Sequence, residues 1–358
     1  MKQTYGYDSY HGRSRARTVL TALVAILLVV LAAVVAFFLL AQRYIVYTDD
    51  GQAHLELPFF QKTTPTPGPA PVESQNIVII TPDPTPTPTP TLKPAVKAVW
   101  LLRGAITDGS AEAQVKAEGG SAVVFNMKAD DGTLGYVSSL PQAIALNSSA
   151  AEAGLNDAIK ALTSGPLYTI ARVSCFKDNK APRNDNSLAI KTNSGYNWQD
   201  PEGRRWMNVS FPAAREYVIG VCKELAELGF DEILLTNCGY PPNGTGQMGW
   251  LRVDATYPWG SLDTIEGPFL AQVKAAIEPH GAVLSVEALG RELAGEERAT
   301  GLTVDNVAEN CAHVWMAESD ALAYESVVAA DGRLGKLLVP MSAQAGDEDK
   351  PWAVVTGG

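Results

Sequence analysis

Four acidic residues follow short apolar segments of the sequence: Glu287, Glu318, Asp178 and Asp130. Two carboxyl groups can act as acid and base together when burial or a neighbouring charge keeps one protonated and the other ionised. Glu287 and Glu318 follow consecutive segments, so they could face each other, with Asp178 or Asp130 as the alternative second group. These residues predict acid–base chemistry at one site.

Cations, amides and aromatic rings follow the same apolar segments. Flat aromatic faces bordered by polar groups suit sugar rings, whose C–H faces stack on them. The candidate binding residues are Lys128, Arg172, Lys177, Trp206, Asn208, Thr236, Asn237 and Tyr240. The alternative is that charged loop residues are simply solvated and that tryptophans pin long loops to the domain.

The apolar segments have the length and composition of strands, and helical patterns separate them. The predicted strands are Val96–Leu102, Ala122–Met127, Leu167–Val173, Asp231–Leu235, Ala282–Val286, His313–Met316, Lys336–Val339 and Trp352–Val355. The predicted helices are Ala150–Leu162, Ala213–Leu228, Ile265–Ile277 and Asp320–Ala330. Strands alternating with helices pair in parallel, and eight of them in about 250 residues are typical of a (β/α)8 barrel.

In such an α/β, TIM-barrel-like fold the loops after the strands form one rim, where the candidate residues would converge. The alternative is an open doubly wound sheet. The GxGxxG run Gly244–Gly249 favours a dinucleotide site only weakly, because no strand immediately precedes it and no clear helix follows. The short AQAGDEDK stretch before the last strand has no room for a helix, so the C-terminal end of the barrel could be degenerate.

The N-terminal region predicts a membrane anchor. Thr18–Ala41 carries no charge, and about 20 such residues cross the hydrocarbon core as a helix. Basic residues precede this segment, so residues 1–17 are expected to be a cytoplasmic tail, 18–42 a single transmembrane helix, and the remainder extracytoplasmic. The alternative is a cleaved signal peptide, whose apolar core is usually shorter and ends at a small-x-small site.

Two further segments separate the anchor from the barrel. Residues 43–62 contain Asp50–Gly51 between apolar residues, which predicts a juxtamembrane hairpin. Residues 63–95 are rich in Pro and Thr and predict an extended linker. Residues 96–358 are left for the barrel domain.

Composition excludes some functions. The net charge of −11 and pI near 4.9 argue against nucleic acid as a partner, because phosphate binding needs a basic face. Cys175, Cys222, Cys238 and Cys311 have no zinc spacing and are interpreted as small buried residues, with Cys175 and Cys238 the likeliest pair if a disulfide exists. The four histidines are scattered, so no metal or other cofactor is predicted.

Several stretches resemble one family closely: ARVSCFKD, LAIK, a Trp-Gln-Asp followed by Arg-Arg-Trp, ELAELGFDEI and, upstream, AVVFNMKADDG. They are similar to a family known as DUF4015, a glycoside-hydrolase-like TIM barrel. The resemblance implies a barrel that acts on a glycan, a polysaccharide or oligosaccharide. Glu287 stands where the fifth strand of the family ends in an acid, and the residues in other matching positions include Lys128, Asp130, Asp131, Arg172, Lys177 and Asp178.

The sequence departs from the family where chemistry would occur. Asn126, Asn208 and Thr236 stand where the family carries carboxylates. Three hypotheses follow. The first is an envelope glycoside hydrolase that uses Glu287 with Glu318, Asp178 or Asp130. The second is a degenerate barrel that binds glycan without cutting it. The third is a stalked scaffold that contacts another envelope protein.

Overall fold

The computed structural model describes residue 24, residues 45–47, 53–55, 96–242, 262–297 and 300–355. The chain divides into two units, Met1–Thr87 and Pro88–Gly358. The predicted linker and the Gly244–Gly249 run lie outside the described residues, as does the predicted transmembrane segment apart from Val24. Within the described residues, no helix is both long and apolar enough to cross a bilayer.

In the first unit, β1 (Ile45–Tyr47) pairs antiparallel with β2 (Ala53–Leu55). Ile45 lies opposite Leu55 and Tyr47 opposite Ala53. The pairing agrees with the hairpin predicted around Asp50–Gly51.

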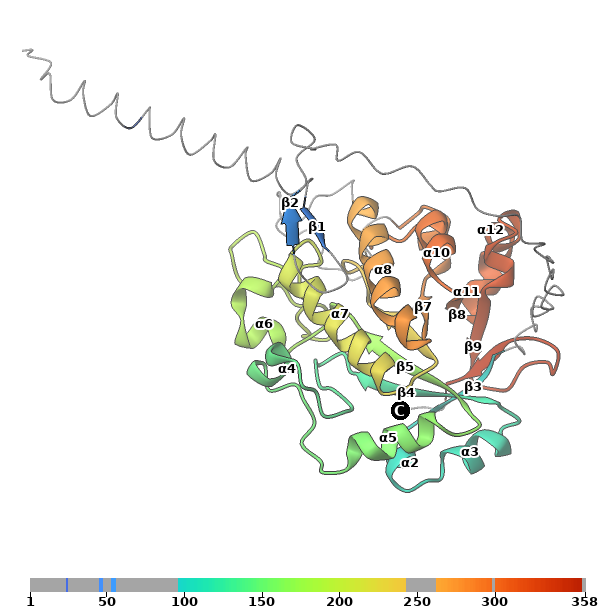
Figure 1. The fold of residues 1–358 in the computed structure, drawn as a ribbon. Helices are drawn as coiled ribbons and strands as arrows, with labels where there is room; N and C mark the ends of the chain where they lie inside the picture. Colours follow the sequence, from blue (N-terminus) through green and yellow to red (C-terminus); the bar gives the residue numbers. More distant parts are fainter. Residues whose placement is uncertain are drawn as a thin grey trace, which may run out of the picture. The chain divides into compact units, whose positions relative to one another are not determined.

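The second unit is built on eight parallel strands that close into a barrel (Figure 1), in the order β10-β3-β4-β5-β6-β7-β8-β9. Their bounds are β3 Lys97–Leu101, β4 Ala122–Lys128, β5 Tyr168–Ser174, β6 Glu232–Thr236, β7 Val283–Glu287, β8 His313–Ala317, β9 Leu338–Ser342 and β10 Trp352–Val354. Seven of the predicted strands are present within one residue at each end, whereas β9 begins two residues and ends three residues later than predicted. The closed barrel rules out the open sheet.

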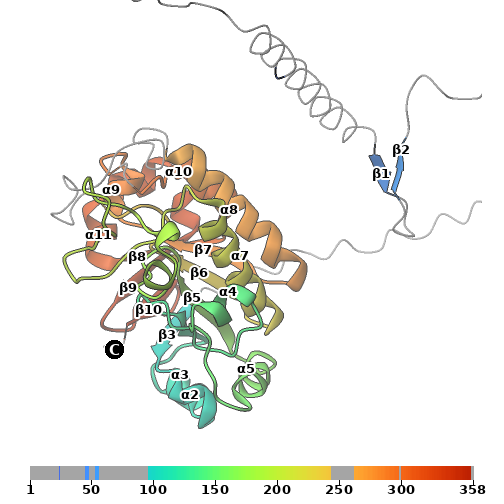
Figure 2. The same ribbon diagram turned by 90° about the vertical axis from the view of Figure 1, so that its left-hand side faces the viewer.

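Helices lie around the outside of the strands (Figure 2). They are α2 Gly104–Thr107, α3 Ala111–Ala117, α4 Pro141–Ala145, α5 Leu155–Thr163, α6 Ala181–Asn184, α7 Pro212–Glu227, α8 Asp263–Ile277, α9 Gly290–Leu293, α10 Val304–Asn310, α11 Glu318–Ala323 and α12 Glu325–Ala330. Short 3₁₀ helices span Asn186–Leu188, Glu278–His280 and Leu334–Lys336.

Two helix predictions need correction. The helix expected from Ala150 begins only at Leu155, because Gly154 immediately before it adopts a left-handed backbone. The helix expected over 320–330 divides at Tyr324, whose ring packs so closely on Gly290 that a Cβ there would approach it to 2.3 Å. The backbone of Tyr324, with φ of −111° and ψ of 24°, lies outside helical geometry.

Successive side chains of each strand point to opposite sides of the barrel wall, so the domain has two hydrophobic cores. One set of side chains packs outward against the helices, as Val123 and Phe125 do on β4. The inward set fills the barrel with Ala98, Ala122, Val124, Ile170, Leu234, Trp315, Val339 and Ala353. At the N-terminal end of the strands, the buried carboxylate of Glu232 accepts hydrogen bonds from Tyr168 Oη (3.0 Å) and Trp315 Nε1 (3.0 Å) and contacts His313 Nδ1 at 2.9 Å.

The C-terminal end of the barrel closes without a helix between β9 and β10. Ala353 of β10 pairs with Met341 on one side and with Ala98 on the other. A loop takes the place of the missing helix, and its Gly346 packs on the outward Trp352, where a Cβ would lie 3.0 Å from the Trp352 side chain. All four cysteines are buried and free.

Candidate functional site

A cavity of about 310 Å³ lies at the C-terminal rim of the barrel and is called the strand-end cavity below. Active sites of this fold occupy that rim. The residues lining it are Asp130, Arg172, Trp206, Thr236, Asn237, Cys238, Gly239, Tyr240, Pro242, Glu287, Ala288, Leu289, Glu292, Thr300 and Leu302. The lining therefore combines three carboxyl groups, one guanidinium, amide and hydroxyl groups, and two aromatic rings.

Strand register explains how the central members reach this cavity. Residues 170, 172 and 174 of β5 pair with 232, 234 and 236 of β6, and the alternate residues of β7 that continue this face are 283, 285 and 287. Because Ile170 and Leu234 fill the barrel, Arg172, Thr236 and Glu287 lie on the same inward face at the ends of their strands.

Asp130 lies in a network of cations. Arg172 Nη2 contacts Asp130 Oδ1 at 2.9 Å, and Lys177 Nζ lies 3.6 Å from Asp130 Oδ2. Burial alone would raise the pKa of Asp130, but these two cations outweigh it and hold the pKa below its usual range. Asp130 is therefore ionised at neutral pH.

Glu287 has the opposite environment. Burial raises its pKa and the charge of Asp130 adds to this effect, while Arg172 opposes it. The same cavity thus holds one carboxyl group that favours its proton and another that releases it. This division of roles is what acid–base catalysis by two carboxyls requires.

Lys177 joins this network from the long loop after β5. Its Nζ lies 2.8 Å from Glu202 and 3.4 Å from Asp200, in addition to its contact with Asp130. Trp206 Nε1 donates to Asp200 Oδ2 at 3.1 Å, so the loop is tied to the rim by polar contacts. Trp206 lines the cavity, whereas Lys177 borders the cavity only through Asp130.

The segment after β6 forms the other wall. Asn237 has a left-handed backbone with φ of 49°, which is uncommon for a residue other than glycine. Gly239 packs against the Thr300 carbonyl, to which an added Cβ would approach within 1.7 Å. The Tyr240 hydroxyl bonds Asn208 and Ser210, which places Asn208 behind Tyr240 and outside the cavity lining.

The structure does not bring Lys128 or Asp178 to the cavity. A register shift between Asn126 and Lys128 turns Lys128 to the outside of the barrel, 5.9 Å from the centre of the Tyr217 ring on α7. There Lys128 Nζ pairs with Asp178 Oδ2 at 2.8 Å, and neither side chain is exposed. Neither residue belongs to the lining of the strand-end cavity.

Glu318 is also separated from Glu287. It is the first residue of α11, is exposed, and is absent from the cavity lining. The odd-numbered residues of β8 face the barrel interior. The strand ends at Ala317, and helix α11 begins at Glu318 and leads the chain out of the barrel. The Glu318 side chain therefore points away from the cavity. The structure therefore brings Asp130 and Glu287 together, without Asp178 or Glu318.

Glu292 is a buried acid that the sequence interpretation missed. It lies in α9, and its Oε2 accepts the Leu289 N–H at 2.6 Å. Burial raises its pKa to about 7. Its position in the loop after β7 was a signal for the rim, but a four-residue helix gives no periodicity that would show which way the side chain points.

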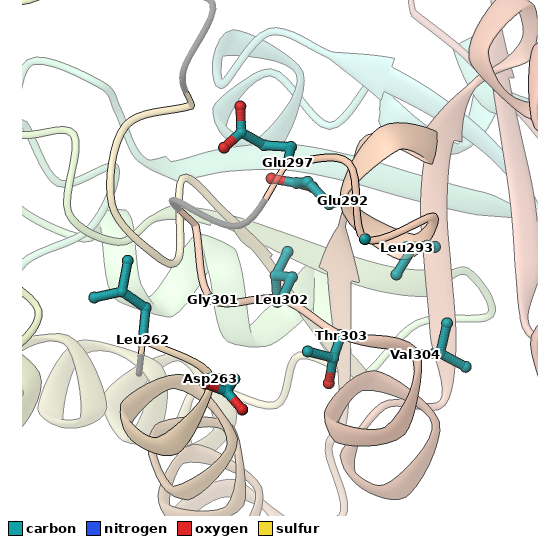
Figure 3. Close-up of a pocket in the computed structure, with 10 residues that line it drawn as sticks. Leu262, Asp263, Glu292, Leu293, Glu297, Gly301, Leu302, Thr303 and Val304 are labelled. Atoms are coloured by element: carbon teal, nitrogen blue, oxygen red, sulfur yellow. The ribbon is translucent and has the colours of Figure 1, made fainter. Parts of the chain in front are cut away.

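A second cavity of about 290 Å³ lies beside α9 and the start of α10 (Figure 3). It shares Glu292 and Leu302 with the strand-end cavity. Asp263 and Glu297 also line it.

Among the described residues, no group of three or more His, Cys, Asp or Glu side chains is arranged to hold a metal ion.

Three solved structures are among those that match this chain. A hypothetical protein from Ruminiclostridium thermocellum is 24% identical, covers 52% of this chain and 96% of its own, with a TM-score of 0.45. The glycoside hydrolase domain of PgaB (BpsB) from Bordetella bronchiseptica is 14% identical, with coverages of 74% and 94% and a TM-score of 0.48. Aspergillus fumigatus Ega3, solved with galactosamine, is 13% identical, with coverages of 71% and 80% and a TM-score of 0.43.

No curated protein matches the sequence. A family model does match, over residues 113–315, which span strands β4 to β7 and most of β8. Its description reads "Putative glycosyl hydrolase domain". The match covers more than half of the chain and includes Asp130, Arg172, Thr236 and Glu287. The chain therefore belongs to the DUF4015 family of glycoside-hydrolase-like domains.

Proposed function

We propose that this protein is a membrane-anchored, extracytoplasmic glycoside hydrolase that acts on a cell-envelope or extracellular glycan in the strand-end cavity. One observation carries the proposal: Glu287 and Asp130 line the same cavity with their pKa values displaced in opposite directions. The aromatic rings of Trp206 and Tyr240 on its wall suit a sugar ring.

In this mechanism Glu287 is the general acid and protonates the oxygen of the scissile glycosidic bond. Asp130 is the second carboxyl, kept ionised by Arg172 and Lys177. It either activates a water molecule or attacks the anomeric carbon, and the separation of the two carboxyls across the sugar decides between inversion and retention.

A second candidate is glycan binding without hydrolysis. The ion pairs that keep Asp130 ionised also engage both of its oxygens, at 2.9 Å to Arg172 and 3.6 Å to Lys177. In addition, Thr236 is neutral at the end of β6, where the family carries an acid. A carboxylate engaged in this way is a weaker base or nucleophile than a free one, which favours binding alone.

The membrane placement rests on the uncharged segment Thr18–Ala41 and the basic residues before it. Fusing alkaline phosphatase to the C-terminus should give an active enzyme in intact cells, because the fusion would lie outside the cytoplasm. Sequencing the mature N-terminus should return the initial residues. A mature end near Ala41 would instead show cleavage of a signal peptide.

The hydrolase proposal is tested by reducing-end release from purified peptidoglycan and from extracellular polysaccharide. Removing a general acid lowers the rate by about 10²–10⁴-fold, so Glu287→Gln should lose activity and still bind glycan. Glu318→Gln is the matched control, since it removes an exposed acid one strand away. Equal losses in the two variants would refute the choice of Glu287 with Asp130. Binding of glycan by the wild type without release of reducing ends would support the second candidate.

A further inference from the structure

Thr236 carries an unpaired hydroxyl in the wall of the strand-end cavity. Its side chain is 2% exposed, and its Oγ1 forms no hydrogen bond in the described part of the chain. Buried hydroxyl groups in folded proteins are normally hydrogen-bonded, because leaving one unpaired is unfavourable. An unpaired hydroxyl that lines a cavity indicates a ligand atom as its missing partner.

Hydrogen bonds to the neighbouring strand hold the backbone at Thr236 and Asn237 in place. The Thr236 carbonyl accepts the Cys175 N–H at 2.8 Å, and the Asn237 carbonyl accepts the Phe176 N–H at 3.1 Å. Asn237 Nδ2 also donates to Ser174 Oγ at 3.0 Å, which helps hold its left-handed backbone. Residues kept in such conformations by their surroundings concentrate at functional sites.

Glu287 lies next to this hydroxyl. Leu235 of β6 pairs with Val286 of β7, so the next residues, Thr236 and Glu287, are neighbours on adjacent strands. Neighbouring strands lie about 4.8 Å apart, and both side chains face inward. Among the described residues, the Glu287 side chain makes no hydrogen bond and no ion pair, although the charge of Arg172 acts on it. In the part of the chain that the structure describes, these two adjacent side chains of one cavity wall therefore lack a hydrogen-bonding partner.

We infer that Thr236 and Glu287 together bind one uncharged hydroxyl group of a sugar ring, which makes Thr236 a residue that determines specificity. A threonine hydroxyl can donate and accept, so it matches a sugar hydroxyl, which does the same. An acid at this position, as the resemblance to the family implies, would only accept when ionised. The inference rests on the proposed function in one respect: it takes the strand-end cavity as the glycan site.

The test compares Thr236→Val, which keeps the shape of the side chain and removes the hydroxyl, with Thr236→Ser, which keeps the hydroxyl. Ser285→Ala is the matched control, because Ser285 is a buried hydroxyl of the same barrel interior that does not line the cavity. Calorimetry on the full chain measures the Kd of an N-acetylglucosamine tetrasaccharide. Crystals of the full chain, with and without this tetrasaccharide, show what lies at Thr236 Oγ1.

Thr236→Val should weaken binding about tenfold, the effect of losing one hydrogen bond, whereas Thr236→Ser and Ser285→Ala should bind like the wild type. Unchanged binding by Thr236→Val would overturn the inference. If the wild type does not bind this sugar, the crystals decide: a water within hydrogen-bonding distance of both Thr236 Oγ1 and Glu287 supports the inference, and a hydroxyl turned onto a protein carbonyl overturns it. Binding that depends on Thr236 without any hydrolysis would refute only the hydrolase proposal.

Discussion

Replacing Asp178 by Asn tests whether the buried ion pair outside the barrel is structural. Asp178 Oδ2 lies 2.8 Å from Lys128 Nζ, and both side chains are fully buried. Asp178 Oδ1 accepts the backbone N–H groups of Lys180 and Ala181, each at 2.9 Å. An asparagine keeps a neutral oxygen for those two bonds, so the substitution removes mainly the charge.

The expected cost is large because the Lys128 ammonium would stay buried without a counter-charge. Removing one member of a buried ion pair destabilises a protein by about 3–5 kcal/mol. Lys128 Nζ still donates to the carbonyls of Ser174 (2.7 Å) and Cys175 (3.3 Å), which partly compensate its charge. We therefore expect a loss near the lower end, about 3 kcal/mol.

Urea unfolding followed by tryptophan fluorescence measures this loss. With a urea dependence of about 3 kcal/mol per molar, the midpoint of Asp178→Asn should fall by about 1 M. Glu216→Gln, which removes a negative charge from the exposed face of α7, should unfold like the wild type. If Asp178→Asn kept its midpoint but lost glycan hydrolysis, the structural role would be refuted and Asp178 would belong to the chemistry.

Two further predictions concern buried carboxyls and pH. A carboxyl group whose pKa is raised in the folded protein contributes stability that is fully present below its unfolded pKa and is lost as the pH rises through its folded pKa. For Glu292 these two values are 4.5 and about 7, so the folded protein should be about 3 kcal/mol less stable at pH 8 than with this group protonated. Glu292→Gln should remove this loss, and an unchanged fall in the urea midpoint between pH 5 and pH 8 would contradict it. Burial alone would raise the pKa of Glu232, but hydrogen bonds, of which that with His313 has the largest effect, lower this pKa. The stability that ionised Glu232 contributes to the folded protein is therefore present above pH 4.5 and is lost as the pH falls through the folded-state pKa. Glu232→Gln should cost about 1–3 kcal/mol at pH 7 and less near pH 3, and equal losses at both pH values in thermal unfolding would count against this network.

The strands could be predicted because each is a short apolar run with clear boundaries. Segments such as Ala122–Met127 and Ala282–Val286 have few other ways to bury their side chains, and their alternation with helices predicts parallel pairing. Closure at the C-terminal end was harder to foresee, because the loop between β9 and β10 is too short for the helix that usually connects two strands of this fold. Backbone pairing of β10 with both neighbours closes the barrel nevertheless.

The candidate site was predictable only where simple alternation holds. Glu287 and Arg172 keep the inward face of regular strands, so alternation along the strand is enough to place both side chains in the lining of the strand-end cavity. Lys128 did not follow this rule, because the register shift on β4 turns it outward. Glu318 did not either, because a helix begins immediately after its strand.

The sequence by itself determined which residues stand at the ends of the strands, because apolar runs and their breaks are local properties of the chain. It also determined the uncharged segment from Thr18 to Ala41 and the Pro/Thr-rich stretch that follows. Only the tertiary structure decided which strand-end groups share a cavity. Burial, ion pairing and side-chain direction depend on residues far apart in sequence, such as Asp130 with Arg172, Lys128 with Asp178, and Thr236 with Glu287.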